Sequence, residues 1–135
     1  MPKEYHREYY RKNLASKPGY LKERKTTPSA TVHPTVADIH WAAGFFDGEG
    51  HINIYKGRHA SIGITVTNCD LEPLEKFQRL FGGRINKKTK GPRNQQQAYY
   101  WGVYGIRAFG VIQTLYSILS TRRQDRCRAA LKAVE

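Results

Sequence analysis

The sequence predicts a mixed α+β domain in which helices cover one face of a four-stranded antiparallel sheet. Two observations lead to this fold class. Hydrophobic patterns of helical and alternating period follow one another in the order helix, two strands, helix, two strands, helix, helix. Within the strands, apolar and polar residues alternate, which is typical of a sheet with one packed face and one open face.

The first half of this pattern covers residues 36–68. Thr35 and Asp38 form a capping-box pattern ahead of apolar residues at helical spacing. This predicts a helix over 36–47 that ends in glycines. Segments 50–55 and 61–68 then alternate with period two around the turn 56–59, which predicts an antiparallel hairpin.

The second half repeats the pattern. Asp70 is placed to cap a helix over 71–81, and two glycines follow that helix. The remaining elements are predicted as two strands and two helices, at 84–88, 96–104, 106–119 and 122–134. A basic loop joins the two strands, so the sheet has cations at one edge.

Residues 1–34 differ from the rest and are predicted to be a basic N-terminal extension, with the folded domain at 35–135. The chain has a formal net charge of +12, which favours a polyanionic partner, and nucleic acid is the usual one. The extension is rich in Lys and Arg. A flexible solvated tail and a DNA-binding arm that orders on contact both fit this composition.

Several classes are excluded by composition. Cys69 and Cys127 are far apart and have no histidine at ligand spacing, which argues against a disulfide scaffold and a zinc finger. No segment resembles a secretory signal or a membrane span. We expect an intracellular protein without membrane contact. No nucleophilic triad or phosphate-cradling glycine loop points to a small-molecule substrate.

The most specific motif is residues 42–50, which read AAGFFDGEG. It resembles the signature of the LAGLIDADG homing endonucleases, and the element order that follows resembles the αββαββα core of that family. The resemblance covers about three quarters of the chain. It implies a sequence-specific double-strand DNA endonuclease that acts on a long pseudo-palindromic site and leaves short 3′ overhangs.

The motif also has a physical reading of its own. Small residues at a spacing of four let two helices approach closely, and a chain with one motif must take the second helix from another copy. The predicted interface residues of this homodimer are His40, Ala43, Gly44 and Asp47. Asp47 also suits a mainly structural role at the helix end.

Two Glu49 carboxylates would meet beside the twofold axis and repel each other unless divalent cations lie between them. We therefore predict that Glu49 is catalytic and that Glu49 and Gly48 are metal ligands. Oxygen donors of this kind suit Mg²⁺, with Mn²⁺ as a substitute. Paired metal ions stabilise the attacking and leaving oxygens of phosphodiester hydrolysis.

The resemblance implies two further catalytic residues. Asn68 matches a polar residue at the end of the second strand that positions the attacking water, although an Asn that ends a strand before a helix fits equally well. Arg122 or Arg123 stands near the place of a family lysine, where this chain has Thr121. A basic residue expected shortly after Asn68 is replaced by Glu72.

These two departures support an alternative, a non-cleaving DNA-binding regulator or an RNA-splicing maturase on the same scaffold. A basic RNA-binding structural protein is a third possibility. For the leading hypothesis, the partner is double-stranded DNA read by the open sheet face. The predicted DNA contacts are His51, Asn53, Tyr55, Lys56, Arg58, Ser61, Thr65, Thr67, Arg84, Asn86, Lys87, Lys88, Lys90, Arg93, Gln96, Tyr100 and Arg123.

Overall fold

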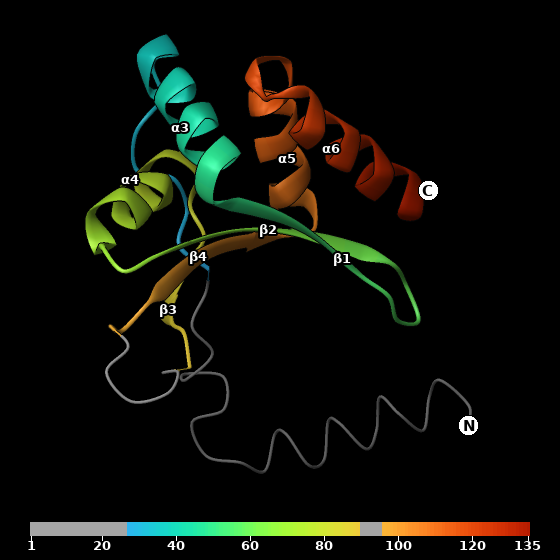
Figure 1. Cartoon of the computed structure of the whole chain (residues 1–135), viewed down its shortest axis with the longest axis horizontal. Coiled ribbons are helices and arrows are strands. Elements are labelled where there is room, and N and C mark those ends of the chain that lie inside the picture. Colours follow the sequence, from blue (N-terminus) through green and yellow to red (C-terminus); the bar gives the residue numbers. More distant parts are fainter. Residues whose placement is uncertain (1–26, 90–95) are drawn as a thin grey trace.

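The computed structural model describes residues 27–89 and 96–135. Four strands form one antiparallel sheet with the order β1-β2-β4-β3, and the helices lie together on one side of it (Figure 1). This confirms the predicted fold class. Most of the predicted N-terminal extension, and the predicted DNA contacts Lys90 and Arg93, lie outside the described residues.

Most element boundaries agree with the sequence-based prediction. The elements are α3 (Val36–Glu49), β1 (Gly50–Tyr55), β2 (Ser61–Asn68), α4 (Leu71–Phe81), β3 (Arg84–Lys87), β4 (Tyr99–Tyr104), α5 (Ile106–Leu115), the 3-10 helix η1 (Tyr116–Ile118) and α6 (Thr121–Ala133). Strand β4 begins three residues later than predicted. The helix predicted at 106–119 tightens into η1, where the Leu119 amide bonds to both the Leu115 and the Tyr116 carbonyls.

Helix α3 continues through Gly48 and Glu49, two residues beyond its predicted end. Gly50 then ends the helix in extended backbone, with φ −86° and ψ 159°, and begins β1 directly. The ring of Phe46 lies so close that a Cβ at Gly50 would be 2.2 Å from its Cδ2 atom. Only glycine fits at this junction, so the motif helix passes into the sheet without an intervening loop.

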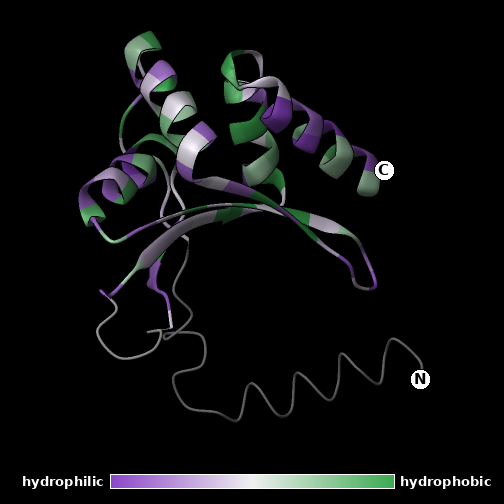
Figure 2. Cartoon of the chain, in the orientation of Figure 1, coloured by the Kyte–Doolittle hydropathy of each residue, from purple (hydrophilic) through white to green (hydrophobic). Residues whose placement is uncertain are grey.

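The core lies between the helices and the sheet. Its largest fully buried side chains include Trp101 of β4, Phe77 of α4 and Phe46 of α3. The rings of Trp101 and Phe77 are tilted against each other with centroids 4.9 Å apart, and the Trp101 indole nitrogen donates to the Gly82 carbonyl at 2.7 Å. Figure 2 shows mostly hydrophobic residues along α5 and strongly hydrophilic stretches along α6. Helix α6 is therefore a surface helix with a narrow packed side.

The segment before α3 is part of the folded unit. The Gly83 amide donates to the Pro28 carbonyl at 2.9 Å, and the Thr31 amide donates to the Arg79 carbonyl at 2.9 Å. Arg107 also donates to the Pro28 carbonyl, at 2.6 Å. The folded contacts thus begin several residues before the predicted domain start at 35. No helix in the described ranges is long and apolar enough to cross a membrane.

The predicted capping box at the start of α3 is confirmed. The Asp38 amide donates to the Thr35 hydroxyl at 3.1 Å, and the Thr35 amide donates to the Asp38 carboxylate at 3.0 Å. Asp38 also pairs with Lys76 of α4 at 3.7 Å. The cap therefore joins the beginning of α3 to α4.

Loss of this cap is expected to destabilise the protein. Thr35→Ala removes the acceptor of the Asp38 amide and should lower the free energy of unfolding by about 1 kcal/mol in urea denaturation. Thr114→Ala is the matched control, because Thr114 lies within α5 and bonds only to the Gly110 carbonyl of its own helix. A Thr35→Ala protein as stable as the control would contradict the assignment.

The cap also has a pH dependence. The hydrogen bonds from Thr35, first its amide and then its hydroxyl, hold the pKa of Asp38 below its ordinary value of 3.8. A carboxyl with a lowered folded-state pKa stabilises the fold above its ordinary pKa, and this effect is lost as the pH falls through the lowered value. The stability difference between wild type and Asp38→Asn should therefore shrink in acid denaturation series below pH 3.8.

Candidate nucleic-acid interface and catalytic centre

The face of the sheet away from the helices is polar and contains no acid. Along the register, His51 of β1 lies opposite Thr65 of β2. Thr65 lies opposite Gly102 of β4, and Gly102 lies opposite Arg84 of β3. The side chains that share this face are His51, Asn53, Tyr55, Ser61, Thr65, Thr67, Arg84, Asn86, Tyr100 and Tyr104. None of the four strands contains an Asp or Glu.

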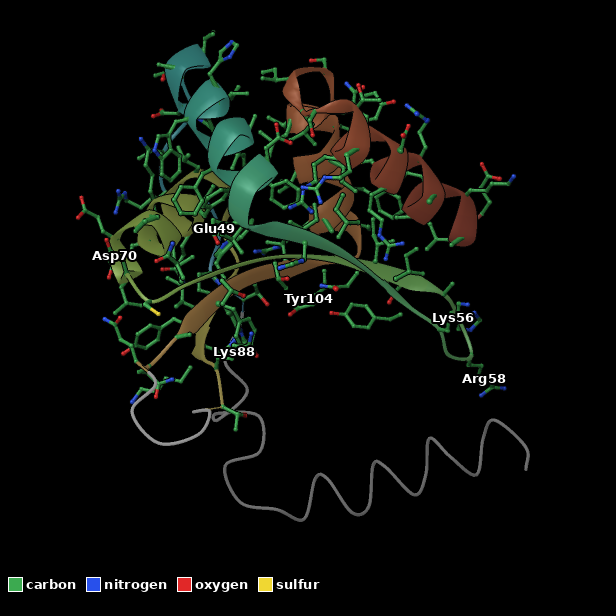
Figure 3. The ribbon with its side chains drawn as sticks, viewed as in Figure 1. Glu49, Lys56, Arg58, Asp70, Lys88 and Tyr104 are labelled. Carbon is green, nitrogen blue, oxygen red and sulfur yellow. The ribbon has the colours of Figure 1, made fainter. Side chains whose placement is uncertain are left out.

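Cations lie at the ends of this face. Lys56 and Arg58 are at the tip of the β1–β2 hairpin, and Lys88 follows β3 on the side away from the helices (Figure 3). Gln96 is exposed ahead of β4. Lys87 differs from its prediction: it pairs with Tyr99, and strand alternation puts it on the helix side of the sheet with Ile85. Lys87 is therefore not on the open face.

Tyr104 is on the open face and was not among the predicted contacts. It lies 51% exposed beside Tyr55, which is 43% exposed, with ring centroids 6.1 Å apart. Partial burial, and then the neighbouring Tyr55 and Tyr100, raise the pKa of Tyr104 above its ordinary value. The hydroxyl is therefore neutral at physiological pH and adds no negative charge to the face. The alternation 100, 102, 104 in the sequence already contained this signal.

Glu49 occupies the last turn of α3 and is exposed beside the start of β1 (Figure 3). Its carboxylate makes no hydrogen bond or ion pair with any of the described residues. The Gly48 carbonyl belongs to the same last turn, where carbonyls lack the intrahelical partner found further back. Both oxygens are hard donors of the kind that Mg²⁺ prefers.

One chain does not make a complete metal site from its described residues. No three His, Cys, Asp or Glu side chains gather within 27–89 and 96–135. Glu49 and the Gly48 carbonyl fit the chemistry of a divalent cation, and a cation bound there would need further ligands from outside these residues. A second copy of the chain is the source that the motif predicts.

The end of α3 is fixed by contacts from the segment that begins α6. The Asp47 carboxylate accepts from the Ser120 amide at 3.1 Å and from the Ser120 hydroxyl at 3.0 Å. Arg123 donates through Nε at 3.2 Å and Nη2 at 3.1 Å to the Asp47 backbone carbonyl. We call these contacts of Asp47, Ser120 and Arg123 the helix-end clamp.

The clamp gives two of the predicted site residues a structural role. Arg123 is 9% exposed and bonds to the carbonyl end of α3 through Nε and Nη2, so the structure gives it a role in holding that helix end, and its DNA contact stays a prediction. Asp47 binds Ser120 of its own chain, which agrees with its structural interpretation, and its place at a dimer interface stays a prediction. A cation beside the carbonyl end of a helix is electrostatically favourable.

The predicted interface face of α3 is only partly right. Ala43 is 1% exposed and packs in the core of its own chain, so its place at the interface is wrong. His40 and Gly44 are exposed on the opposite side. At Gly44 and Gly48 no atom lies within 4 Å of the position that a Cβ would take. The exposed side of α3 is therefore a smooth strip of His40, Gly44 and Gly48, which we call the α3 strip.

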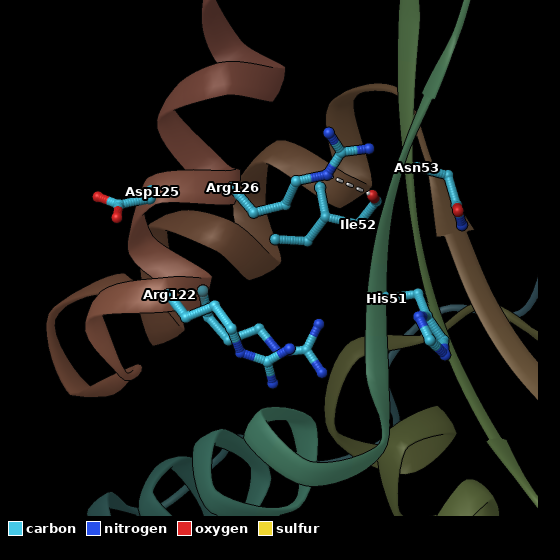
Figure 4. Close-up of a pocket in the computed structure, with 7 residues that line it drawn as sticks. His51, Ile52, Asn53, Arg122, Asp125 and Arg126 are labelled. Atoms are coloured by element: carbon cyan, nitrogen blue, oxygen red, sulfur yellow. Dashed lines mark hydrogen bonds between the residues drawn. The ribbon is translucent and has the colours of Figure 1, made fainter.

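A basic hollow of about 570 Å³ lies between α6 and the outer edge of β1 (Figure 4). His51 and Asn53 line it from β1. From α6 it is lined by three arginines and one acid, namely Arg122, Arg123, Arg126 and Asp125. Arg126 donates through Nε to the Ile52 carbonyl at 3.1 Å. This bond covers part of the free edge of β1 and fixes the direction of the guanidinium. Arg126 was missed in the sequence, although it follows Arg122 at helical spacing.

The structure gives Asn68 a local role. Its side-chain oxygen accepts from the Asp70 amide at 2.8 Å, and the Asp70 carboxylate accepts from the Glu72 amide at 3.0 Å at the start of α4. Alternation from Val66 also puts Asn68 on the helix side of β2. A water-positioning role for Asn68 stays a prediction, and the turn at the strand end explains the residue by itself.

The helix-end clamp is expected to contribute to stability. Asp47→Ala removes the acceptor of both Ser120 donors and should lower the free energy of unfolding by about 1.5–3 kcal/mol, as loss of charged hydrogen bonds does. Asp125→Ala is the matched control, because Asp125 forms only an exposed ion pair with Arg128. Chemical denaturation curves that coincide for the two variants would show that the clamp contributes nothing.

Comparison with known sequences gives a family and a relative. The family model of the LAGLIDADG-like domain matches residues 40–129. The intron-encoded RNA maturase bI4 of Saccharomyces cerevisiae is 39% identical over 49 residues, which are 36% of this chain and 8% of that protein. The chain thus spans a small part of the curated relative that it matches.

Solved structures share the fold. The group I intron-encoded homing endonuclease I-CeuI, complexed with DNA, matches with a TM-score of 0.55 and 16% identity over 90% of this chain and 62% of that one. The archaeal intron-encoded homing endonuclease I-Vdi141I, also complexed with DNA, matches with a TM-score of 0.50 and 18% identity over 64% of this chain and 60% of that one. The family match covers the motif, the sheet and most of α6, and the chain belongs to the LAGLIDADG family.

Proposed function

We propose that the protein is a sequence-specific double-strand DNA endonuclease that acts as a homodimer. One observation carries this proposal: an exposed carboxylate without a partner among the described residues, Glu49, is held at a clamped helix end beside an acid-free sheet face. An ordinary polar surface does not require an acid that is held in a fixed position. A phosphodiester hydrolase that uses divalent cations requires such an acid as a metal ligand.

The open sheet face is suited to duplex DNA. A two-stranded β-ribbon fits the major groove, where each base pair presents its own pattern of donors and acceptors. Amide, hydroxyl and guanidinium groups on this face can read that pattern, and the flanking Lys56, Arg58 and Lys88 supply charge for the phosphates. The structural neighbours I-CeuI and I-Vdi141I are described in complex with DNA, which supports this partner.

The α3 strip supports the homodimer. Two helices that present glycines to each other can approach closely, and a surface that pairs with its own copy gives a twofold dimer. Gly48 lies at the end of this strip, one residue before Glu49. Pairing through the strip therefore brings the two Glu49 residues together at the twofold axis. Each Glu49 then faces a different strand of the DNA duplex.

Each residue of the centre then has a defined role. Glu49 and the Gly48 carbonyl would hold Mg²⁺, or Mn²⁺ in its place, and a bound divalent cation supplies the charge that stabilises the oxygens of the scissile phosphate. Arg122 and Arg126 lie at the β1 edge beside the start of the same strand and bind phosphate oxygens. The two half-sites together should span about 20 base pairs, one helical turn for each subunit.

A second function on the same scaffold is RNA maturation without DNA cleavage. The observation in its favour is the relative bI4, described as an RNA maturase, with 39% identity over 49 residues. Glu72 and Thr121, where the family resemblance led us to expect basic residues, point the same way. Incubation of the protein with a plasmid library of random sites, with and without EDTA, separates the two functions, because only an endonuclease linearises plasmids in a metal-dependent manner.

Substitution of the central carboxylate tests the endonuclease directly. Glu49→Gln keeps the shape of the side chain and removes its charge, so it should lower the cleavage rate by at least about a hundredfold. Affinity for the same DNA, measured in EDTA, should stay within a few-fold. Glu75→Gln, on the exposed side of α4, is the control and should cleave at the wild-type rate. Undiminished cleavage by Glu49→Gln would end the proposal.

The arginines of the basic hollow are tested by salt dependence. Loss of one phosphate contact should weaken binding to all DNA sequences alike and reduce the slope of log affinity against log salt by about one. We expect this of Arg126→Ala. Arg128→Ala is the matched control, since Arg128 does not line the hollow and is engaged by Tyr116 and Asp125. Equal slopes for the two variants would show that Arg126 makes no phosphate contact.

A further inference from the structure

Two glycines lie in the middle of the open sheet face. Gly63 of β2 is opposite Asn53 of β1 and Tyr104 of β4. Gly102 of β4 is opposite Thr65 and Arg84. Glycine weakens a strand interior, so its presence indicates that another group approaches the backbone closely. In this sheet the groups that approach the two glycines are mainly tyrosine side chains.

The rings of Tyr55 and Tyr104 occupy the space above these glycines. A Cβ at Gly63 would lie 2.6 Å from Cδ1 of Tyr104 and 2.8 Å from Cε2 of Tyr55. A Cβ at Gly102 would lie 2.9 Å from the Tyr104 hydroxyl. One ring thus touches both glycine positions, so it lies along the sheet instead of projecting from it. We call Tyr55 and Tyr104 over the two glycines the tyrosine platform.

The tyrosine platform is an exposed apolar area within a polar face. Its rings are 43% and 51% exposed, and the methyl group of Thr65 lies 3.3 Å from the Cβ position of Gly102, at the edge of the platform. The surrounding side chains are amides, hydroxyls and cations, among them Asn53 and Arg84. A DNA-contacting surface that recognised bases by hydrogen bonds alone would have no need for such an apolar area.

The major groove offers one apolar group, the C5 methyl of thymine. We propose that the tyrosine platform reads thymine methyl groups and so requires an A·T pair at a fixed position of each half-site. The assignment rests on the proposed function, because it needs the open face to lie in the major groove of duplex DNA. The platform discriminates by apolar contact, whereas the flanking amides and guanidinium discriminate by hydrogen bonds.

The test uses binding without cleavage. The wild-type protein, in EDTA, selects sites from a random duplex library, and the selected sites are then made again with deoxyuridine in place of single thymines. At the platform position the loss of one methyl should weaken binding about fourfold, the effect of burying one methyl-sized group. The same replacement elsewhere in the half-site should have a smaller effect.

Variants assign the effect to the platform. Tyr104→Ser should bind the thymine and uracil sites equally, and Tyr104→Phe should keep the preference because it keeps the ring. Tyr100→Ala, on the same face and strand but outside the platform, should weaken binding and still distinguish thymine from uracil. If Tyr104→Ser fails to fold by circular dichroism, Gly63→Ala replaces it, since its Cβ displaces both rings.

The possible failures are distinct. Duplex binding by the wild type with no thymine preference at any position, or with a preference that Tyr104→Ser retains, would overturn the platform and leave the endonuclease proposal standing. No binding of the wild type to any duplex, with binding to single-stranded RNA instead, would overturn the proposed function and the platform together. A uracil effect that disappears in Tyr104→Ser and persists in Tyr100→Ala supports the assignment.

Discussion

The clamp on the carbonyl end of α3 is the contact on which the rest of the site depends. Arg123 donates two hydrogen bonds to the Asp47 carbonyl, and the Asp47 side chain accepts from Ser120. The last turn of a helix normally frays, because its carbonyls lack partners. Here the Asp47 carbonyl is bonded to Arg123 of α6, and the Asp47 side chain is bonded to Ser120 just before that helix. Helix α3 can therefore end abruptly at Gly50 and continue as β1, with Glu49 at a defined place beside the sheet.

The same junction explains an unfavourable placement of charge. A carboxylate in the last turn of a helix lies at the negative end of the helix dipole, where anions are disfavoured. The buried Arg123 offsets this by placing a cation at the carbonyl end. Glu49 itself is left without a protein partner among the described residues, which is an arrangement that a cation can complete. Residues that depart from local preference are expected where function requires them.

Much of the fold followed from the sequence, because hydrophobic period identifies helices and strands and because caps and glycines locate their ends. The hairpin and the start of α3 were predicted to the residue. The site was predicted less completely. Ala43 was assigned to the interface because small residues suit both a helix–helix interface and a tightly packed core, and only tertiary packing decides between them. The structural role of Arg123 was missed because its partner, the Asp47 carbonyl, is 76 residues away in the chain.

Periodicity in the sequence indicates the side of the strand or helix on which Tyr104 and Arg126 lie, but it does not indicate what they contact. The role of Tyr104 depends on Gly63, which only the strand register brings beside it. Arg126 points to β1 because α6 lies along the edge of that strand, and no pattern within α6 reveals this. A local stretch of sequence shows periodicity, but it does not show which distant residues of the chain lie beside it in the fold.

The central claim is that two copies of α3 pair through the α3 strip and bring both Glu49 residues together. It is tested most directly by cross-linking. In a Cys69→Ser background, where Cys127 is buried, Glu49→Cys is treated with a short bifunctional thiol reagent in the presence of duplex DNA. The account predicts efficient covalent dimers through residue 49 and few through Arg58→Cys at the hairpin tip (Figure 3). Absence of dimers at residue 49, or equal yields at both positions, would contradict it.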